Sequence, residues 1–472
     1  MARVVIVSNR IPLPGDRGAR AGGLAVALRD AIKRGGLWFG WSGKTSEAPL
    51  PTPSVTVQGR ASYATIDLDT EDYRRFYAGF SNGTLWPLLH SRLGLMEYDR
   101  AEYAGYEAIN AAYAKALAPL LTPDDVIWIH DYQLIPLAHR LREAGVRNRI
   151  GFFLHVPFVP ASVFRSLPCA KALLQDFCAY DVVGLQTDEH LKDFLDCMTV
   201  ILGAEVRSDG TVRLGGARTL AIADPIGIDG ALFARLATRT VASPEVARLN
   251  ESLVGRALII GADRLDYSKG LPNRVVAFER LLSRFPEHRQ KVSYLQIAAA
   301  SREEVKEYRT LRRDLDRAVG ALNGKFAEFD WVPLRYMTRA VARPTLAGFY
   351  RVARIGLVTP LRDGMNLVAK EYVAAQDPAD PGVLILSCFA GAAEEMTEAV
   401  IVNPYDADAI AEAMRAALMM PLDERRMRHA ALLEKVMRSS ANAWSRRFLT
   451  TLQSWERHGS ANLAAWSGVT SN

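Results

Sequence analysis

Short runs of consecutive apolar residues, many of them β-branched, recur along the chain, and each is bounded by turn-forming or polar residues. Consecutive rather than alternating apolar positions are typical of strands that are covered on both faces of a sheet. Between these runs apolar residues recur at helical spacing, as in the stretch from Asp406 to Leu418 and at Leu24, Leu28 and Ile32. The predicted strands are Val4–Val7, Val126–Ile129, Ile150–Leu154, Val182–Leu185, Leu258–Ile260, Val292–Ile297, Ile355–Val358, Val383–Leu386 and Val400–Val402.

The alternation of strands and helices predicts an α/β fold with parallel sheets joined by right-handed crossovers. A chain of 472 residues exceeds one ordinary core, which favours two domains. A new series of strands begins at Leu258, so we expect an N-terminal domain over residues 1–235 and a C-terminal domain over residues 236–439. The tail, about residues 440–472, carries Trp444, Phe448 and Leu452 at helical spacing, and we expect this helix to dock back on the first domain.

Composition narrows the class of protein. Hydrophobic residues make up 49% and charged residues 23%, which is ordinary for a soluble globular protein and excludes disordered and fibrous classes. The net charge of +6 comes from scattered Lys and Arg, so we expect no nucleic-acid partner. No apolar run approaches the roughly 20 residues of a membrane span, and no signal-peptide core is visible, so a cytoplasmic protein without a membrane partner is expected. Cys169, Cys178, Cys197 and Cys388 form no C-x-x-C pair and are expected to be packed, reduced thiols.

Unusual polar residues follow several predicted strands. In open parallel sheets ligands bind beyond the carboxyl ends of the strands, so the set of these endings predicts a ligand site. A capped turn remains a fair interpretation of any single ending. The polar endings are Ser8-Asn9-Arg10, His130-Asp131-Tyr132, His155, Gly261-Ala262-Asp263-Arg264 and Thr359-Pro360-Leu361-Arg362-Asp363-Gly364.

The segment Asp263–Gly270 holds two cations, Arg264 and Lys269, next to a predicted strand end and a glycine. Arg suits bidentate phosphate binding and Lys acts as a point charge, so the pair can grip a diphosphate. A surface salt-bridge cluster with Asp263 and Asp266 explains the same residues equally well. The spacing alone does not decide between them.

Three further signals are weak when taken singly. Gly22 and Gly23 precede a predicted helix whose N-terminus suits an anion, although a plain loop is the default interpretation. Glu371 lies one turn into the helix after Asn366, where a carboxylate can bind a ribose diol or simply favour the helix dipole. His155 stands among apolar residues, which is more typical of a core histidine. No spacing of metal ligands is present, so neither a metal site nor a cofactor is expected.

Together these motifs resemble the trehalose-6-phosphate synthase family, glycosyltransferase family 20. They occur in the family's order and span residues 3 to about 405. The resemblance implies the GT-B glycosyltransferase fold, with two facing Rossmann-like domains and the active site in the cleft between them. The matching motifs are Ser8-Asn9-Arg10, Ala21-Gly22-Gly23-Leu24, Phe80-Ser81-Asn82-Gly83-Thr84-Leu85-Trp86-Pro87, His130-Asp131-Tyr132-Gln133-Leu134, Asp263–Leu271 and Asp363–Glu371.

The resemblance also assigns roles to single residues. Arg264 and Lys269 are similar to the clamp on the donor's diphosphate, and Asp363 to the residue that holds hydroxyls of the transferred glucose. The implied donor site further contains Gly22, Gly23, His155, Val341 through its backbone, Gly364, Met365, Asn366, Leu367, Val368 and Glu371. The implied acceptor site contains Arg10 and Arg302 on the phosphate, together with Trp41, Tyr77, Trp86, Asp131 and Tyr132. The residues with an implied catalytic role are Asp131, His155, Arg264, Lys269 and Asp363.

The implied reaction moves glucose from UDP-glucose, or another nucleotide-glucose, to glucose 6-phosphate with retention of the anomeric configuration. We find no carboxylate that matches a covalent nucleophile, so a front-face displacement is our hypothesis. No D-x-D metal motif is present, and a metal-independent reaction in a homo-oligomer, a dimer or a tetramer, is expected.

One residue departs from the family pattern. Val159 stands between Phe158 and Pro160, where the family has proline directly after the phenylalanine. A displaced proline alters a loop near the acceptor. Two alternatives to the implied reaction are a transferase with another phosphorylated acceptor, such as glycerol 3-phosphate, and a non-catalytic homologue that only binds sugar phosphates.

Overall fold

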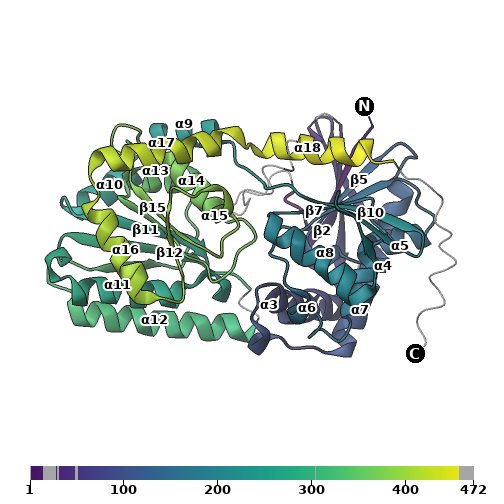
Figure 1. Cartoon of the computed structure of the whole chain (residues 1–472), viewed down its shortest axis with the longest axis horizontal. Helices are drawn as coiled ribbons and strands as arrows, with labels where there is room; N and C mark the ends of the chain where they lie inside the picture. The colour runs from purple at the N-terminus through teal and green to yellow at the C-terminus, as the bar shows by residue number, and fades with distance from the viewer. Residues whose placement is uncertain are drawn as a thin grey trace. The chain divides into compact units, whose positions relative to one another are not determined.

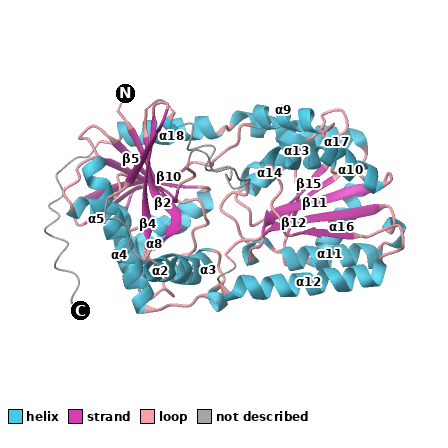
Figure 2. Cartoon of the chain, turned by 180° about the vertical axis from the view of Figure 1, so that it is seen from behind, coloured by secondary structure: helices cyan, strands magenta, loops and turns pink. Residues whose placement is uncertain are grey.

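A computed structural model describes residues 2–13, 28, 31–33, 35–47, 52–302 and 305–456. The chain folds into two compact units (Figures 1 and 2). The described residues up to Pro225 and those from Asn442 onward form the first unit, and Ile226 to Ala441 form the second. The chain therefore enters the second unit ahead of residue 236, because the helix Gly230–Thr240 packs on helices of that unit.

The first unit is built on a ten-stranded sheet in the order β3-β4-β2-β1-β5-β6-β7-β10-β9-β8. The strands from β4 to β10 in this order run parallel, and antiparallel hairpins extend the sheet at both edges. The sheet is thus parallel at its centre and mixed overall. Its strands are β1 (Val4–Arg10), β2 (Leu37–Thr45), β3 (Ser54–Gln58), β4 (Ala61–Leu68), β5 (Val126–His130), β6 (Arg149–Phe153), β7 (Val182–Leu185), β8 (Glu205–Val206), β9 (Thr211–Leu214) and β10 (Ala217–Ala223).

The connections reverse direction at β1 in this sheet. From β1 the chain moves outward to β2 on one side and later returns to β5 on the other. Such a switch point opens a crevice beyond the carboxyl ends of the two strands, which is where ligands bind in open α/β sheets. Arg10 ends β1, and Asp131 follows β5.

The helices of the first unit are α2 (Thr70–Tyr73), α3 (Trp86–Leu89), α4 (Arg100–Leu117), α5 (Leu137–Glu143), α6 (Ala161–Phe164), α7 (Ala170–Phe177), α8 (Asp188–Leu202) and α18 (Ala441–Ser454). Between α2 and α3 the chain forms a π-helix, Arg74–Leu85. Stretches of π-helix are rare and often occur at functional sites. This one carries Tyr77 and Asn82 and leads directly into Trp86.

The C-terminal helix α18 packs on the sheet of the first unit. The ring of Phe448 stacks on Trp128 of β5 with 4.8 Å between centroids, and Trp444 lies 4.9 Å from the same indole. Gly151 and Gly184 leave the space that Phe448 fills, because a Cβ at either position would lie within 3 Å of its ring. Aromatic residues at helical spacing in the tail therefore fill a groove that glycines in two strands leave open.

The second unit is built on a six-stranded parallel sheet in the order β13-β12-β11-β14-β15-β16. This is the order of a classical dinucleotide-binding sheet, and its switch point lies between β11 and β14. Its strands are β11 (Ala257–Arg264), β12 (Val292–Ala299), β13 (Leu334–Met337), β14 (Ile355–Val358), β15 (Val383–Ser387) and β16 (Val400–Val402).

Helices cover both faces of this sheet. Figure 2 shows α9, α13, α14 and α17 on one face and α11 and α12 on the other. The helices are α9 (Gly230–Thr240), α10 (Pro244–Leu253), α11 (Leu271–Arg284), α12 (Lys306–Phe326), α13 (Arg343–Val352), α14 (Leu367–Ala375), α15 (Ala392–Glu395), α16 (Ala407–Met419) and α17 (Leu422–Arg438). The predicted α/β class with parallel sheets is confirmed in both units.

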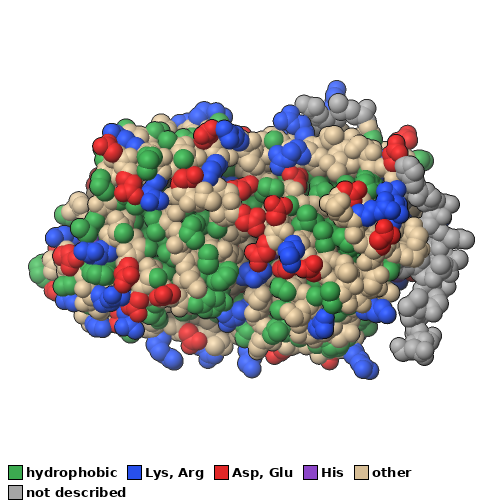
Figure 3. Space-filling model, viewed as in Figure 1, with side chains coloured by type: hydrophobic (Ala, Val, Ile, Leu, Met, Phe, Trp, Pro, Cys, Tyr) green, Lys and Arg blue, Asp and Glu red, His purple; other side chains and the backbone are tan. Residues whose placement is uncertain are grey.

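The surface charges and the burial of the cysteines bear on two expectations that were drawn from the composition. The face drawn in Figure 3 intersperses basic with acidic side chains, as scattered charges along the sequence predict. Cys169, Cys178 and Cys197 are buried free thiols, whereas Cys388 is exposed, so the expectation of packing was wrong for that residue. Its backbone follows the buried end of β15, but its side chain does not share that burial. None of the described helices is long and apolar enough to cross a membrane.

Candidate functional site

Arg10 lies at the switch point of the first unit, where its guanidinium lies near an aromatic ring. Its guanidinium carbon lies 5.9 Å from the ring centroid of Trp41 on β2. Gly43 makes this position possible, because a Cβ there would lie 2.5 Å from Nε of Arg10, and its φ of +92° suits glycine. The side chain of Arg10 is exposed at the carboxyl end of β1, so its charge can reach a ligand.

Aromatic rings and one amide line the same end of the first sheet. Trp41 lies 6.1 Å from Tyr77 on the π-helix, and Trp86 lies 5.7 Å from Tyr132. Asn82 joins the two pairs: its Oδ1 accepts a 2.8 Å hydrogen bond from Oη of Tyr132, and its Nδ2 donates to the carbonyl oxygen of Tyr77 at 2.8 Å. The π-helix therefore brings the predicted acceptor residues of three segments together. Asn82 itself was missed as a site residue, although it lies inside the Phe80–Pro87 motif.

Asp131 adopts a backbone conformation that is unusual for a side chain with a Cβ. Its φ is +75° and its ψ is 164°. Such strain occurs where the surrounding structure fixes it, often at functional sites. The backbone N–H of Asp131 donates to the carbonyl oxygen of Phe153 on β6, and its Oδ1 accepts from the backbone N–H of His155 at 3.2 Å. Asp131 thereby ties the ends of β5 and β6 together.

His155 lies in a row of polar side chains, in which His130 and Gln186 are buried and His155 is partly exposed. Its Nε2 lies 3.0 Å from Nδ1 of His130, and its Nδ1 lies 3.3 Å from Nε2 of Gln186. Burial lowers the pKa of His155 to about 3, and burial together with His155 lowers the pKa of His130 well below 6.5. Both rings are therefore neutral at pH 7. Because both ring nitrogens of His155 have partners, a side-chain contact with sugar has to replace one of these bonds. His130 and Gln186 were not predicted as site residues.

Lys269 and Asp363 meet at the switch point of the second unit. Nζ of Lys269 donates to Oδ2 of Asp363 at 2.5 Å, and Nδ2 of Asn366 donates to the same oxygen at 3.0 Å. Lys269 comes from the short helix Tyr267–Lys269 after β11, whereas Asp363 follows β14. Two segments almost a hundred residues apart thus place a cation, a carboxylate and an amide together at the end of the sheet.

The rival salt-bridge interpretation of Asp263–Gly270 is not supported for Lys269. Its ion pair is with Asp363, outside that segment, while Asp263 pairs with Arg274 at 2.6 Å. Arg264 is exposed at the carboxyl end of β11, beside the switch point. The structure therefore leaves Arg264 and Lys269 at one edge of the sheet, which is the arrangement that a diphosphate clamp requires.

The turn before α14 and the start of that helix form the rest of the predicted donor site. Gly364, Met365 and Asn366 make the turn, and Asn366 has a φ of +70°. Leu367 and Val368 are the first residues of α14 and are partly exposed, so they can contact a base or a ribose.

Glu371 lies one turn further along α14. Its Oε1 lies 3.3 Å from Nη2 of Arg343, and burial raises the pKa of this carboxyl group. Arg343 begins α13, and Val341 lies in the loop just before it. Val341 and Glu371 therefore lie on neighbouring segments of the second unit. Arg343 was missed because no local pattern marks it.

Arg302 differs from the other predicted phosphate-binding residue, Arg10, because its side chain is mostly buried. Its Nη1 lies 3.4 Å from Oδ2 of Asp266 and 2.5 Å from Oη of Tyr308. Asp266 in turn accepts from the backbone N–H of Ser268 at 2.9 Å. Arg302 is thus connected to the segment that carries Lys269. Its own φ is +50°.

Two predicted residues, Gly22 and Gly23, lie outside the described part of the chain. The displaced proline has a local explanation: Pro160 caps the short helix α6, and Val159 before it is fully buried. Among the described residues, no group of three or more His, Cys, Asp or Glu side chains is placed to hold a metal ion.

Comparison with known proteins decides the family. The sequence model of glycosyltransferase family 20 matches residues 3–454. The chain belongs to glycosyltransferase family 20. A trehalose-6-phosphate synthase of Sinorhizobium fredii is 48% identical to this family 20 member over 462 residues, which cover 96% of this chain and 98% of the relative.

Two solved structures of family 20 relatives show the same fold as this chain. The alpha,alpha-trehalose-phosphate synthase (UDP-forming) from Burkholderia xenovorans in complex with glucose-6-phosphate is 46% identical, with a TM-score of 0.92, covering 96% of this chain and all of that one. The E. coli protein bound with UDP-2-fluoro glucose is 45% identical, with a TM-score of 0.91, covering 96% and 99%. The fold predicted from the resemblance, that of the GT-B transferases in this family, is confirmed.

Proposed function

We propose that this chain transfers glucose from UDP-glucose to glucose 6-phosphate, giving trehalose 6-phosphate and UDP. The observation that carries the proposal is the meeting of Lys269 and Asp363 at the switch point of the second sheet, with Arg264 at the same edge. The family 20 relatives support both substrates, because one was solved with glucose-6-phosphate and another with a fluorinated UDP-glucose.

Charge development explains why the reaction needs these donor residues. Breaking the bond between glucose and phosphate leaves negative charge on the departing diphosphate. Fixed cations aimed at that charge stabilise the transition state more than the ground state. We assign this role to Arg264 and Lys269. The carboxylate of Asp363 and the amide of Asn366 lie beside Lys269, where they can bind hydroxyls of the glucose.

The first unit supplies the acceptor residues in this proposal. We assign the binding of the phosphate of glucose 6-phosphate to Arg10, because a guanidinium forms bidentate hydrogen bonds with phosphate. The resemblance to the family assigns a phosphate-binding role to Arg302 as well. Trp41, Tyr77, Trp86 and Tyr132 enclose the sugar ring. Asp131, whose backbone is strained, orients an acceptor hydroxyl. His155 supports the transferred sugar as a neutral side chain, since its pKa is far below 7.

Retention of configuration follows in this proposal from attack on the face that the diphosphate leaves. The departing phosphate oxygen takes the proton of the acceptor hydroxyl as the new bond forms, so no glycosyl-enzyme forms. Intact-protein mass spectrometry after incubation with the donor is expected to show unmodified protein. A covalent glucosyl adduct on the chain contradicts this mechanism.

The function is tested by a matrix of donors and acceptors, assayed for release of nucleoside diphosphate with a chelator present. UDP-glucose with glucose 6-phosphate is expected to give the highest kcat/KM, and the chelator is expected to leave it unchanged. Higher activity with glycerol 3-phosphate would favour the rival acceptor, and ligand binding without turnover would favour the non-catalytic alternative. The proposal also includes a cytoplasmic location. It further includes a homo-oligomer, a dimer or a tetramer, and light scattering of the purified protein measures this oligomeric state.

A further inference from the structure

Arg274, in the first turns of α11, is a fully buried arginine that no motif singles out. Its guanidinium donates to three side chains and one carbonyl. The acceptors are Oδ2 of Asp263 at 2.6 Å, Oγ1 of Thr359 at 3.0 Å, the carbonyl oxygen of Lys269 at 3.1 Å and Oε1 of Gln296 at 3.4 Å. A buried guanidinium with its donors so fully used fixes the groups around it.

Three of these partners belong to the three segments that carry the predicted diphosphate and glucose residues. Asp263 directly precedes Arg264 at the end of β11, and Lys269 is itself a clamp residue. Thr359 follows β14 and begins the segment that leads to Asp363. One side chain thus joins both strands of the switch point and the turn between β11 and α11.

The surroundings are shaped for this guanidinium. Gly261 on β11 leaves room for it, because a Cβ there would lie 3.0 Å from Nη1 of Arg274 and 2.7 Å from Oε1 of Gln296. Tyr294 and Gln296 on β12 hydrogen-bond to each other beside it. A lysine at this position would keep the charge opposite Asp263 but could not reach acceptors in three directions, since it presents a point charge rather than a planar fork.

We propose that Arg274 is a positioning residue that holds Arg264, Lys269 and Asp363 in the relative positions that bind the donor's diphosphate and glucose. The inference rests on the proposed function and adds to it a residue that does not touch the substrate. Its loss is expected to weaken donor binding and turnover and to leave acceptor binding unchanged, because none of its partners belongs to the residues assigned to the acceptor.

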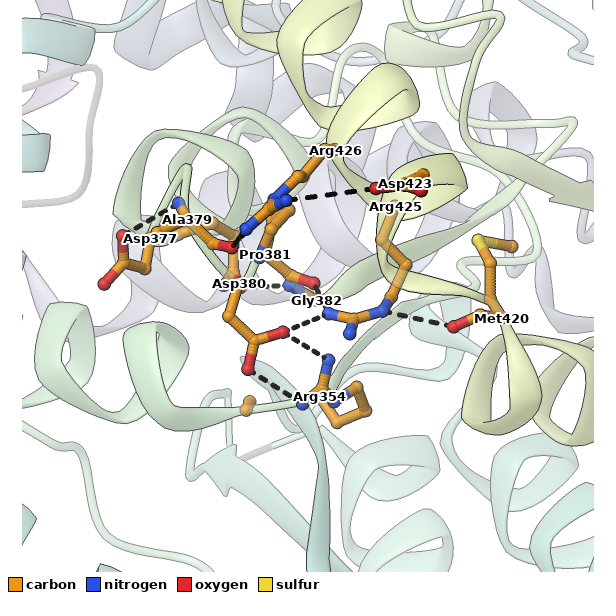
Figure 4. A network of polar contacts seen from close by, with 12 residues as sticks. Arg354, Asp377, Ala379, Asp380, Pro381, Gly382, Met420, Asp423, Arg425 and Arg426 are labelled. Carbon is orange, nitrogen blue, oxygen red and sulfur yellow. Dashed lines mark hydrogen bonds and ion pairs between the residues drawn. The ribbon is translucent and has the colours of Figure 1, made fainter.

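The same unit offers a matched control. Arg425 on α17 is also buried and donates to Oδ1 of Asp380 at 2.6 Å, to the carbonyl oxygen of Met420 at 3.2 Å and to that of Pro381 (Figure 4). Pro381 lies just before β15, at the amino ends of the strands, which is the edge opposite the switch-point residues. Arg425→Lys therefore imitates the loss of a buried guanidinium without touching the donor segments.

The experiment compares Arg274→Lys with Arg425→Lys in the full chain. Calorimetry measures UDP binding, and steady-state kinetics measure KM for UDP-glucose and for glucose 6-phosphate separately. We expect Arg274→Lys to weaken UDP binding and to lower kcat/KM for the donor by about tenfold or more, since small displacements of reacting groups are costly. KM for glucose 6-phosphate and every constant of Arg425→Lys are expected to stay at wild-type values.

A second pair of variants tests one hydrogen bond of Arg274 and leaves the charge of Arg274 in place. Thr359→Val deletes the hydroxyl that Arg274 binds, and Thr359→Ser retains it, so only the valine variant is expected to raise KM for UDP-glucose. The inference is overturned if Arg274→Lys and Arg425→Lys behave alike, or if Thr359→Val and Thr359→Ser do. Failure of the wild-type protein to bind UDP or to turn over these substrates would instead overturn the proposed function.

Discussion

Nζ of Lys269 lies 2.5 Å from Oδ2 of Asp363. The two side chains come from the segments that follow β11 and β14, the two strands at the switch point of the second sheet. Each side chain is mostly buried, so the interaction is less screened by water than a surface pair. The arrangement keeps a cation and a carboxylate together where phosphate and sugar hydroxyls are proposed to bind.

Lys269→Met is expected to lower kcat by about 100-fold to 1,000-fold, the usual cost of losing one group that stabilises developing negative charge. Lys192→Met is the control, because Lys192 is an exposed lysine of α8 whose ion pair with Asp196 lies on the surface. Turnover of both variants is measured with saturating UDP-glucose and glucose 6-phosphate. Near-normal turnover of Lys269→Met would remove the clamp assignment.

Arg302→Lys is expected to raise KM for glucose 6-phosphate by about tenfold, since a lysine loses the bidentate contact with phosphate. The lysine keeps a positive charge beside Asp266, which limits the effect on the fold. Arg313→Lys on the exposed surface of α12 is the matched control. An unchanged KM for the acceptor would show that Arg302 only supports Asp266 and Tyr308.

Gly43→Ala is expected to displace Arg10 and to raise KM for glucose 6-phosphate while leaving KM for UDP-glucose unchanged. The added Cβ would lie 2.5 Å from Nε of Arg10, and alanine at a φ of +92° adds backbone strain. Gly94→Ala serves as the control, because a Cβ there meets no atom within 4 Å. Steady-state kinetics of the two variants measure KM for each substrate. Equal KM values for glucose 6-phosphate in Gly43→Ala and Gly94→Ala would contradict the placement of Arg10.

His130 and His155 of the first unit predict a pH dependence of stability. Their pKa values are lowered by burial, to about 3 for His155 and well below 6.5 for His130. Below pH 6.5 the unfolded chain therefore binds protons that the folded chain does not, so the free energy of unfolding falls as the pH falls. Each histidine contributes up to about 1.4 kcal/mol per pH unit.

His130→Phe removes one of these groups, so its denaturation midpoint is expected to fall less steeply between about pH 6.5 and pH 5 than that of the wild-type protein. A slope for His130→Phe that equals the wild-type slope would show that His130 does not stay neutral in the folded state.

Local patterns predicted the central strands well. Every predicted apolar run lies in a strand, except that Leu154 extends one residue beyond β6, because a strand buried on both faces has little room for polar residues. The parallel strands β2, β4, β10 and β13 were missed, as were β3, β8 and β9. The sequence of β2, for example, mixes aromatic residues with glycine and lysine, and that of β10 mixes alanine with polar residues. Their position is fixed by pairing with neighbours rather than by their own composition.

Only the site residues that lie within recognisable sequence motifs could be predicted. The motifs named Lys269 and Asp363, but nothing in the sequence indicates that they are paired, because that contact depends on the order of strands in the sheet. Arg274, Asn82 and His130 contact residues that are distant in sequence, namely Thr359, Tyr132 and His155. Such residues become visible only when tertiary contacts are known.

The central claim is the transfer of glucose with retention to glucose 6-phosphate. Proton NMR of the product formed from UDP-glucose and glucose 6-phosphate tests it most directly, because the two anomeric signals report the new linkage. We predict a single phosphorylated disaccharide with both anomeric centres in the α configuration, formed in step with UDP release. A β-linked product, or UDP release with free glucose and no disaccharide, would contradict the account.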